Sequence, residues 1–154
     1  MAYRIIGCGA LNRGDDAAGL LVVRRLRELG IGAYEHSGDG VSLIEHWQGL
    51  DAIILIDAVV TGARPGAVTV WDGWKSPIRA SRRSSTHAFG VAEAVKLARV
   101  LGRMPMRLLI CGIEGCKFDL GCRPSPEVVK GAEQLAQRLA YAAAASSCKK
   151  IICL

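Results

Sequence analysis

The sequence predicts an α/β fold, a three-layer α/β/α sandwich in which helices cover both faces of a five-stranded, mostly parallel, twisted sheet. Two observations lead to this prediction. Strand-like apolar runs alternate with amphipathic, helix-like segments along the chain, as in parallel sheets whose strands are joined by crossover helices. The run 52–60 is apolar almost throughout, which is typical of a central strand buried on both faces.

The elements follow one another without an internal linker or repeat. We expect strands at 3–6, 32–36, 52–60, 67–71 and 106–111, and helices at 17–29, 41–47, 88–101 and 126–145. Gly30 follows the first helix in the usual position of a helix stop, and Ser125 precedes the last helix as its expected N-cap. We expect one domain over residues 1–154, with 146–154 as a flexible tail.

The connection between the third and fourth strands determines the direction of the fourth. Only residues 61–66 separate the two strands, and this segment is too short for the crossover helix that a parallel neighbour requires. The fourth strand therefore runs antiparallel to the third, at an edge of the sheet.

Composition excludes several classes of function. The chain has 20 Lys and Arg against 14 Asp and Glu, a net charge of +6. Because no aromatic residues alternate with the basic ones and no helix-turn-helix signature is present, we expect solvated basic faces or a docking surface for an acidic protein, and no nucleic-acid binding. No apolar window of about eighteen residues occurs, and the first residues lead directly into a strand. We therefore expect a cytoplasmic protein, a monomer that does not bind membranes.

The six cysteines indicate free thiols rather than disulfides or structural zinc. No two of them form the closely spaced pair that structural zinc sites use. Cys8 and Cys111 lie within or beside apolar strands, where cysteine usually acts as a small buried hydrophobe.

Candidate functional residues follow from one rule. In open α/β sheets, ligands bind beyond the carboxyl ends of the strands, where the chain reverses its progress across the sheet. Polar residues are expected near that edge at Asn12, Asp15, Asp16, Gly38-Asp39-Gly40, Asp57, His87 and Glu114. Asp57 stands out, because an acid in an otherwise apolar central strand needs a partner. We expect Asp15 to cap a helix, Glu114 to be a solvated strand end, and His36 and His46 to be ordinary surface residues.

Two chemistries are compatible with these residues. Gly7-Cys8-Gly9 follows a strand as in a dinucleotide-binding fingerprint, but the third glycine is replaced by Asn12. Asp15 and Asp16 would also repel a pyrophosphate from the helix N-terminus. The alternative is a metal held by Asp16, Asp57 and His87, since carboxylate and imidazole ligands suit borderline divalent ions such as nickel or zinc.

The chain resembles the hydrogenase maturation proteases in four blocks that occur in the order of that family. The blocks are 7–9 with 14–19, 56–59 with Gly62 and 65–66, 85–87 with Gly90, and 112–114 with Gly121 and 125–128. The resemblance implies an endopeptidase that removes the C-terminal extension of a nickel-loaded [NiFe] hydrogenase large-subunit precursor. It also implies a sheet order of 2-1-3-5-4 with the fourth strand antiparallel.

The same resemblance assigns roles to individual residues. It makes Asp16, Asp57 and His87 the catalytic residues that contact nickel, with the nickel presented by the precursor rather than permanently bound. The turn Gly38-Asp39-Gly40 matches the glycine-rich turn of the family loosely and is expected to contact the substrate. Two alternatives stay open: a non-catalytic nucleotide- or metal-binding module that uses Gly7-Cys8-Gly9, and a peptidase of the same fold that acts on another precursor.

Overall fold

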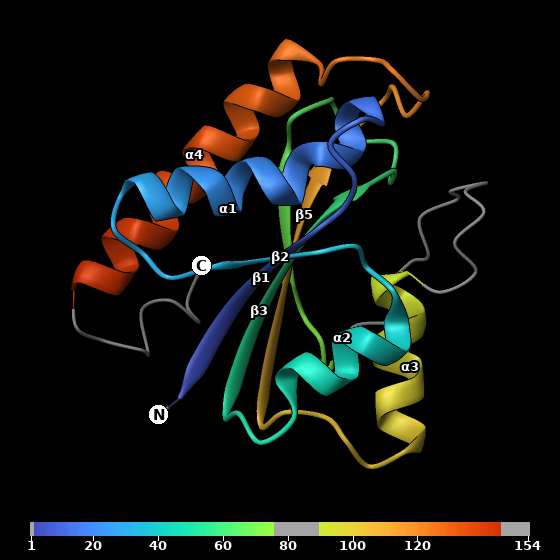
Figure 1. The fold of residues 1–154 in the computed structure, drawn as a ribbon, viewed down its shortest axis with the longest axis vertical. Coiled ribbons are helices and arrows are strands. Elements are labelled where there is room, and N and C mark those ends of the chain that lie inside the picture. Colours follow the sequence, from blue (N-terminus) through green and yellow to red (C-terminus); the bar gives the residue numbers. More distant parts are fainter. Residues whose placement is uncertain (1, 76–89, 146–154) are drawn as a thin grey trace.

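The computed structural model describes residues 2–75 and 90–145, and its centre is a five-stranded sheet (Figure 1). The strands are β1 (Tyr3–Cys8), β2 (Tyr34–His36), β3 (Ala52–Val59), β4 (Val68–Asp72) and β5 (Arg107–Glu114). Their order is β2-β1-β3-β5-β4. β1 pairs in parallel with β2 and β3, β3 pairs in parallel with β5, and β4 pairs with β5 in the antiparallel direction. The predicted strand order and the edge position of an antiparallel β4 are thus confirmed.

Helices cover both faces of the sheet, which confirms the predicted three layers. The helices are α1 (Ala18–Glu28), α2 (Gly40–Trp47), α3 (Val91–Val100) and α4 (Pro126–Ala144). α1 and α4 lie on one face, and α2 and α3 lie on the other (Figure 1). A short 3₁₀ helix, η1 (Gly14–Ala17), leads into α1, so the turn that carries Asp15 and Asp16 is already helical.

Alternating side chains of the strands build two apolar cores. Ile54 and Ile56 of β3 pack with α1 and α4, whereas Ile53 and Leu55 pack with α2 and α3. Each of these side chains is at most 2% exposed, and burying one contributes roughly 1.5–3 kcal/mol. Both faces of β3 are therefore apolar, as its sequence predicts, until Asp57 near the carboxyl end of the strand.

Glycines bring β1 and α1 into close contact. A Cβ atom on Gly7 would lie 2.1 Å from the carbonyl oxygen of Gly19, and one on Gly19 would lie 2.5 Å from that of Cys8. Side chains at either position would push α1 away from the sheet. The segment after β1 is thereby held close to the carboxyl edge, where the candidate residues lie.

Two element ends differ from the prediction in ways that affect the site. β5 continues to Glu114, so this acid belongs to the strand instead of following it. Ser125 occupies the N-cap position of α4, but its side chain makes no capping bond to that helix. Among residues 2–75 and 90–145, no helix combines the length and apolar composition that crossing a membrane requires.

Candidate functional site

The carboxyl ends of the parallel strands bring several chemically distinct residues to one edge. Cys8 lies opposite His36 in the register of β1 and β2. Gly7 lies opposite Ile56 of β3, which places Asp57 beside the end of β1. β5 ends next to β3 at the same edge, with Glu114 opposite Val59. The sheet thus gathers segments that are far apart in the sequence.

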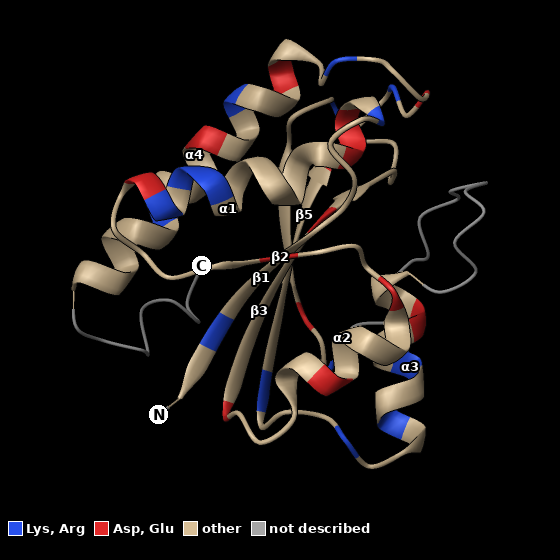
Figure 2. Cartoon of the chain, in the orientation of Figure 1, with Lys and Arg blue, Asp and Glu red and all other residues tan. Residues whose placement is uncertain are grey.

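Asp16 and Asp57 both lie near the Cys8 thiol. Asp16 is 5% exposed and comes from η1, whereas Asp57 is half-buried and comes from β3. Burial first, and then the negative charges of Asp57 and Asp16, raise the pKa of the Cys8 thiol well above its ordinary value. Figure 2 shows acidic residues in the turn that leads into α1. The structure therefore brings together two of the three predicted ligands.

The surroundings of Asp57 show how a carboxylate fits at the end of a buried strand. Its Oδ1 atom accepts a hydrogen bond of 2.9 Å from the backbone N–H of Ala58. Opposite Asp57 on β5 lies Gly112, which has no side chain. A Cβ atom on Gly112 would lie 2.5 Å from the Trp71 ring, so this position is kept small by the packing of β4.

The third predicted ligand, His87, lies outside the described residues. The description resumes at Gly90, the N-cap of α3, which packs on the same face of the sheet as α2. Within residues 2–75 and 90–145, no three His, Cys, Asp or Glu side chains form a group that could hold a metal ion. A metal site formed by Asp16 and Asp57 together with His87 stays a prediction.

Asp15 does not cap a helix, and that prediction was wrong. Its side chain is fully buried and accepts four hydrogen bonds, from the backbone N–H groups of Cys116, Lys117 and Ser125 and from the Ser125 hydroxyl. Burial alone would raise the pKa of Asp15, but the backbone bonds and the hydroxyl bond outweigh it, and the pKa is lowered. Asp15 thus fixes η1, and with it Asp16, to the loop after β5.

Glu114 is not a solvated strand end, and that prediction was also wrong. The residue is 3% exposed. Its carboxylate accepts hydrogen bonds from the Thr61 backbone N–H at 2.8 Å, the Thr61 hydroxyl at 2.8 Å and the Gly62 backbone N–H at 3.0 Å. Glu114 therefore holds the turn that follows β3, two residues beyond the end of the strand that carries Asp57.

The turn Gly38-Asp39-Gly40 lies at the same edge as Asp16 and Asp57. A Cβ atom on Gly38 would lie 3.7 Å from the Cβ atom of Cys8. Asp39 is the N-cap of α2 and accepts a bond of 3.4 Å from the Ser42 backbone N–H. The predicted substrate loop thus lies next to Cys8, and its contact with a substrate stays a prediction.

His36 was missed by the sequence interpretation, which placed it among ordinary surface residues. Its ring is half-buried and hydrogen-bonded at both nitrogen atoms, by the Gly38 backbone N–H at 2.9 Å and with the Ser42 hydroxyl at 3.1 Å. The signal in the sequence was its position at the end of a strand, directly before a glycine-containing turn.

Gly7 in β1 and Gly9 directly after it serve the packing of the chain. Gly9 has φ of +143°, and a Cβ atom there would lie 1.9 Å from the Asp16 carbonyl oxygen. Gly7 is similarly close to Gly19. Because backbone already lies against both glycines and the buried Asp16 carboxylate lies nearby, the structure favours a cation over a phosphate at this edge.

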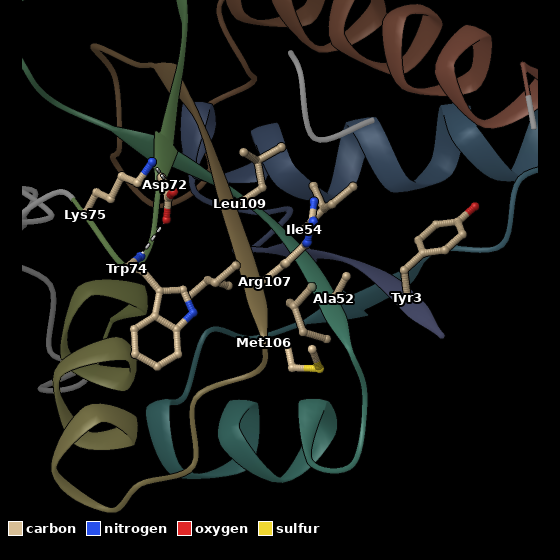
Figure 3. Close-up of a pocket in the computed structure, with 11 residues that line it drawn as sticks. Tyr3, Ala52, Ile54, Asp72, Trp74, Lys75, Met106, Arg107 and Leu109 are labelled. Carbon is tan, nitrogen blue, oxygen red and sulfur yellow. Dashed lines mark hydrogen bonds and ion pairs between the residues drawn. The ribbon is translucent and has the colours of Figure 1, made fainter. Parts of the chain in front are cut away.

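A separate hollow of about 360 Å³ lies at the opposite end of the sheet (Figure 3). It is lined by the starts of β1, β3 and β5 and by the turn after β4. Trp74 borders it and is fixed by an indole N–H bond of 3.0 Å to the Pro105 carbonyl oxygen. Because the hollow lies at the amino ends of the parallel strands, we place the candidate site at the carboxyl edge.

Comparisons with known proteins agree with this geometry. A family model described as hydrogenase maturation protease matches residues 38–142. The chain is 29% identical over 121 residues to the hydrogenase expression/formation protein HupM of Azotobacter chroococcum, covering 75% of this chain and 58% of that protein. It is 23% identical to the hydrogenase 2 maturation protease of Escherichia coli, covering 84% of each. The chain spans 55–58% of the length of the first three curated relatives it matches.

Solved structures show the same fold. The [NiFe] hydrogenase maturation protease HybD from Thermococcus kodakarensis matches with a TM-score of 0.69 and 32% identity, over 91% of this chain and 99% of that one. An endopeptidase from Escherichia coli matches with a TM-score of 0.75 and 21% identity, over 94% of both chains, and this likeness concerns the fold alone.

Proposed function

Because the chain belongs to the hydrogenase maturation protease family, we propose that it is an endopeptidase that removes the C-terminal extension of a nickel-loaded [NiFe] hydrogenase large-subunit precursor. The observation that carries this proposal is the convergence of Asp16 and Asp57 beside Cys8 at the carboxyl edge of the sheet. The protein acts in the cytoplasm as a monomer, and the precursor is its partner.

In this proposal, Asp16 and Asp57 contact the nickel of the precursor, and His87 supplies the third ligand. Two carboxylates and one imidazole form a donor set suited to a borderline divalent ion. The nickel belongs to the substrate and arrives with it, so the protease distinguishes a precursor that contains nickel from one that does not. When bound, such an ion can polarise a peptide carbonyl or activate a water molecule.

The contribution of the chain itself is positioning. Asp15 and the glycines around β1 hold Asp16 in place, and β3 holds Asp57, so the two carboxylates meet the substrate already oriented. Correct orientation of reacting groups can lower a barrier by roughly 7–11 kcal/mol. Asp16 and Asp57 are both candidates for the group that accepts a proton from the attacking water. The turn Gly38-Asp39-Gly40 contacts the peptide that is cut.

The experiment compares nickel-loaded with nickel-free precursor, incubated with the protein and analysed by intact mass. We expect the loaded precursor to lose its C-terminal extension and the nickel-free precursor to remain intact. Equal cleavage of both would rule out recognition of nickel, and cleavage of neither would rule out the proposed activity.

Variants test the individual residues in the same assay. We expect Asp57→Asn and His87→Ala each to abolish cleavage of the loaded precursor. Asp51→Asn is the matched control for Asp57→Asn, because Asp51 precedes the same strand at the opposite end of the sheet. Its carboxylate accepts a hydrogen bond from the Ala2 backbone N–H. Full activity of either site variant would remove that residue from the site.

A further inference from the structure

We propose that His36 is a positioning residue, whose neutral imidazole holds the turn Gly38-Asp39-Gly40 in the shape that receives the precursor's C-terminal peptide. This inference rests on the proposed function, because it concerns how that substrate is held. It goes beyond that function because it assigns a role to a histidine outside the set Asp16, Asp57 and His87.

The hydrogen bonds of the ring determine its protonation state. The backbone N–H of Gly38 donates to Nδ1 at 2.9 Å, so Nδ1 must carry a lone pair. The other nitrogen, Nε2, lies 3.1 Å from the Ser42 hydroxyl oxygen and therefore carries the hydrogen that it donates to this oxygen. A neutral ring with its proton on Nε2 satisfies both contacts, whereas an imidazolium would direct an N–H toward the Gly38 N–H.

His36 connects three parts of the edge, through its ring and through its backbone. Ser42, its partner on α2, also donates its backbone N–H to Asp39 at 3.4 Å. The carbonyl oxygen of His36 accepts a bond of 3.1 Å from the backbone N–H of Gly9, in the loop that lies against Asp16. Gly38 has φ of +89° and lies close to Cys8. The imidazole thus joins Gly38 to Ser42, and the backbone of His36 joins β2 to the loop beside Asp16, so we infer that the shape of the turn depends on this residue.

The charged surroundings keep the ring neutral. Burial first, and then the charge of His46, lower the pKa of His36, whereas Asp39 raises it by a smaller amount. His46 packs edge-on against His36 from α2, with ring centroids 4.9 Å apart. From β1, Cys8 lies opposite His36, and its raised pKa keeps that thiol uncharged. The ring is thus neutral at neutral pH, and acid breaks its bond to Gly38.

The kinetic test measures kcat and KM for the nickel-loaded precursor between pH 5 and pH 8. His36→Ala removes the acceptor for Gly38, so we expect KM to rise about tenfold, as for the loss of one hydrogen bond, with kcat within about twofold. His36→Asn keeps an acceptor near the position of Nδ1 and is expected to restore KM to within about threefold of the wild-type value. His46→Ala removes a positive neighbour, so the rise of KM in acid should begin at a higher pH.

A second measurement does not depend on cleavage. In the free protein, the NMR signal of the Gly38 amide should shift with the titration of the His36 ring, and the ring nitrogens should report a proton on Nε2 at neutral pH. The inference would be overturned if His36→Ala had the KM of the wild type, or if the chemical shift of the Gly38 amide did not change as His36 titrates. If the precursor is not cleaved but the Gly38 amide signal still follows the titration of His36, the result would contradict only the proposed function.

Discussion

Ser125 donates both its backbone N–H, at 2.6 Å, and its hydroxyl, at 3.0 Å, to the carboxylate of Asp15, 110 residues earlier in the chain. The same carboxylate accepts the N–H groups of Cys116 and Lys117. Backbone bonds reinforce the contact, since Gly14 donates to the carbonyl oxygen of Cys122 at 3.0 Å and Asp15 to that of Lys117 at 2.7 Å. The residue next to Asp16 is thus fixed by the last third of the chain.

Replacing Asp15 by Asn should destabilise the protein. The amide can accept at its oxygen, but its NH₂ group would face backbone N–H groups that have lost their acceptor. We expect a loss of about 2–4 kcal/mol in the free energy of unfolding, because buried donors are left unsatisfied. Urea unfolding of Asp15→Asn and of Asp119→Asn, an exposed carboxylate of the same loop, would measure this. Equal midpoints for both variants would contradict the role given to Asp15.

The stabilisation by Asp15 should depend on pH in a defined direction. The pKa of Asp15 is lower in the folded protein than its ordinary value near 4, so the unfolded chain binds the proton more tightly. The contribution is therefore complete above about pH 5 and is lost as the pH falls through the folded pKa. Urea midpoints measured from pH 7 to pH 2 should show the gap between wild type and Asp15→Asn narrowing in acid. A gap that stays constant would refute the assignment.

Glu114 should stabilise the turn after β3 in a graded way. Thr61→Ala removes one of the three bonds that the carboxylate accepts, and we expect a loss of about 1 kcal/mol. Glu114→Ala removes the acceptor of all three bonds, so a loss of about 2–3 kcal/mol is expected. Urea unfolding of both variants gives the order, and a larger loss for Thr61→Ala would be inconsistent with it.

The sequence predicted the fold well because its signals are local. Apolar runs identify the strands, and the short connection 61–66 determines the direction of β4. The same logic located Asp16 and Asp57, because residues near the carboxyl ends of parallel strands meet at one edge. The position of these two residues at one edge could therefore be predicted without knowing their side-chain partners.

The errors at Asp15 and Glu114 have a common physical cause. The partners of Asp15 lie more than 100 residues away, and those of Glu114 more than 50. Sequence periodicity and spacing do not show which distant N–H groups donate hydrogen bonds to a carboxylate. The sequence alone therefore predicts local roles, a helix cap for Asp15 and a solvated strand end for Glu114. A stricter use of one rule, that an acid following a buried strand needs partners, would have identified Glu114.

Gly7, near the end of β1, allows a direct test of why this part of the chain is rich in glycine. Gly7→Ala places a methyl group where the Gly19 carbonyl oxygen lies 2.1 Å away, so α1 must move and the protein should lose several degrees of melting temperature. Gly32→Ala is the matched control, because a Cβ atom there meets nothing within 4 Å and we expect an unchanged melting temperature. If these glycines instead cradled a phosphate, Gly7→Ala would leave the ligand-free protein stable and a dinucleotide would raise the melting temperature of the wild type alone. We expect neither result, because the atoms that oppose Gly7 belong to the chain itself.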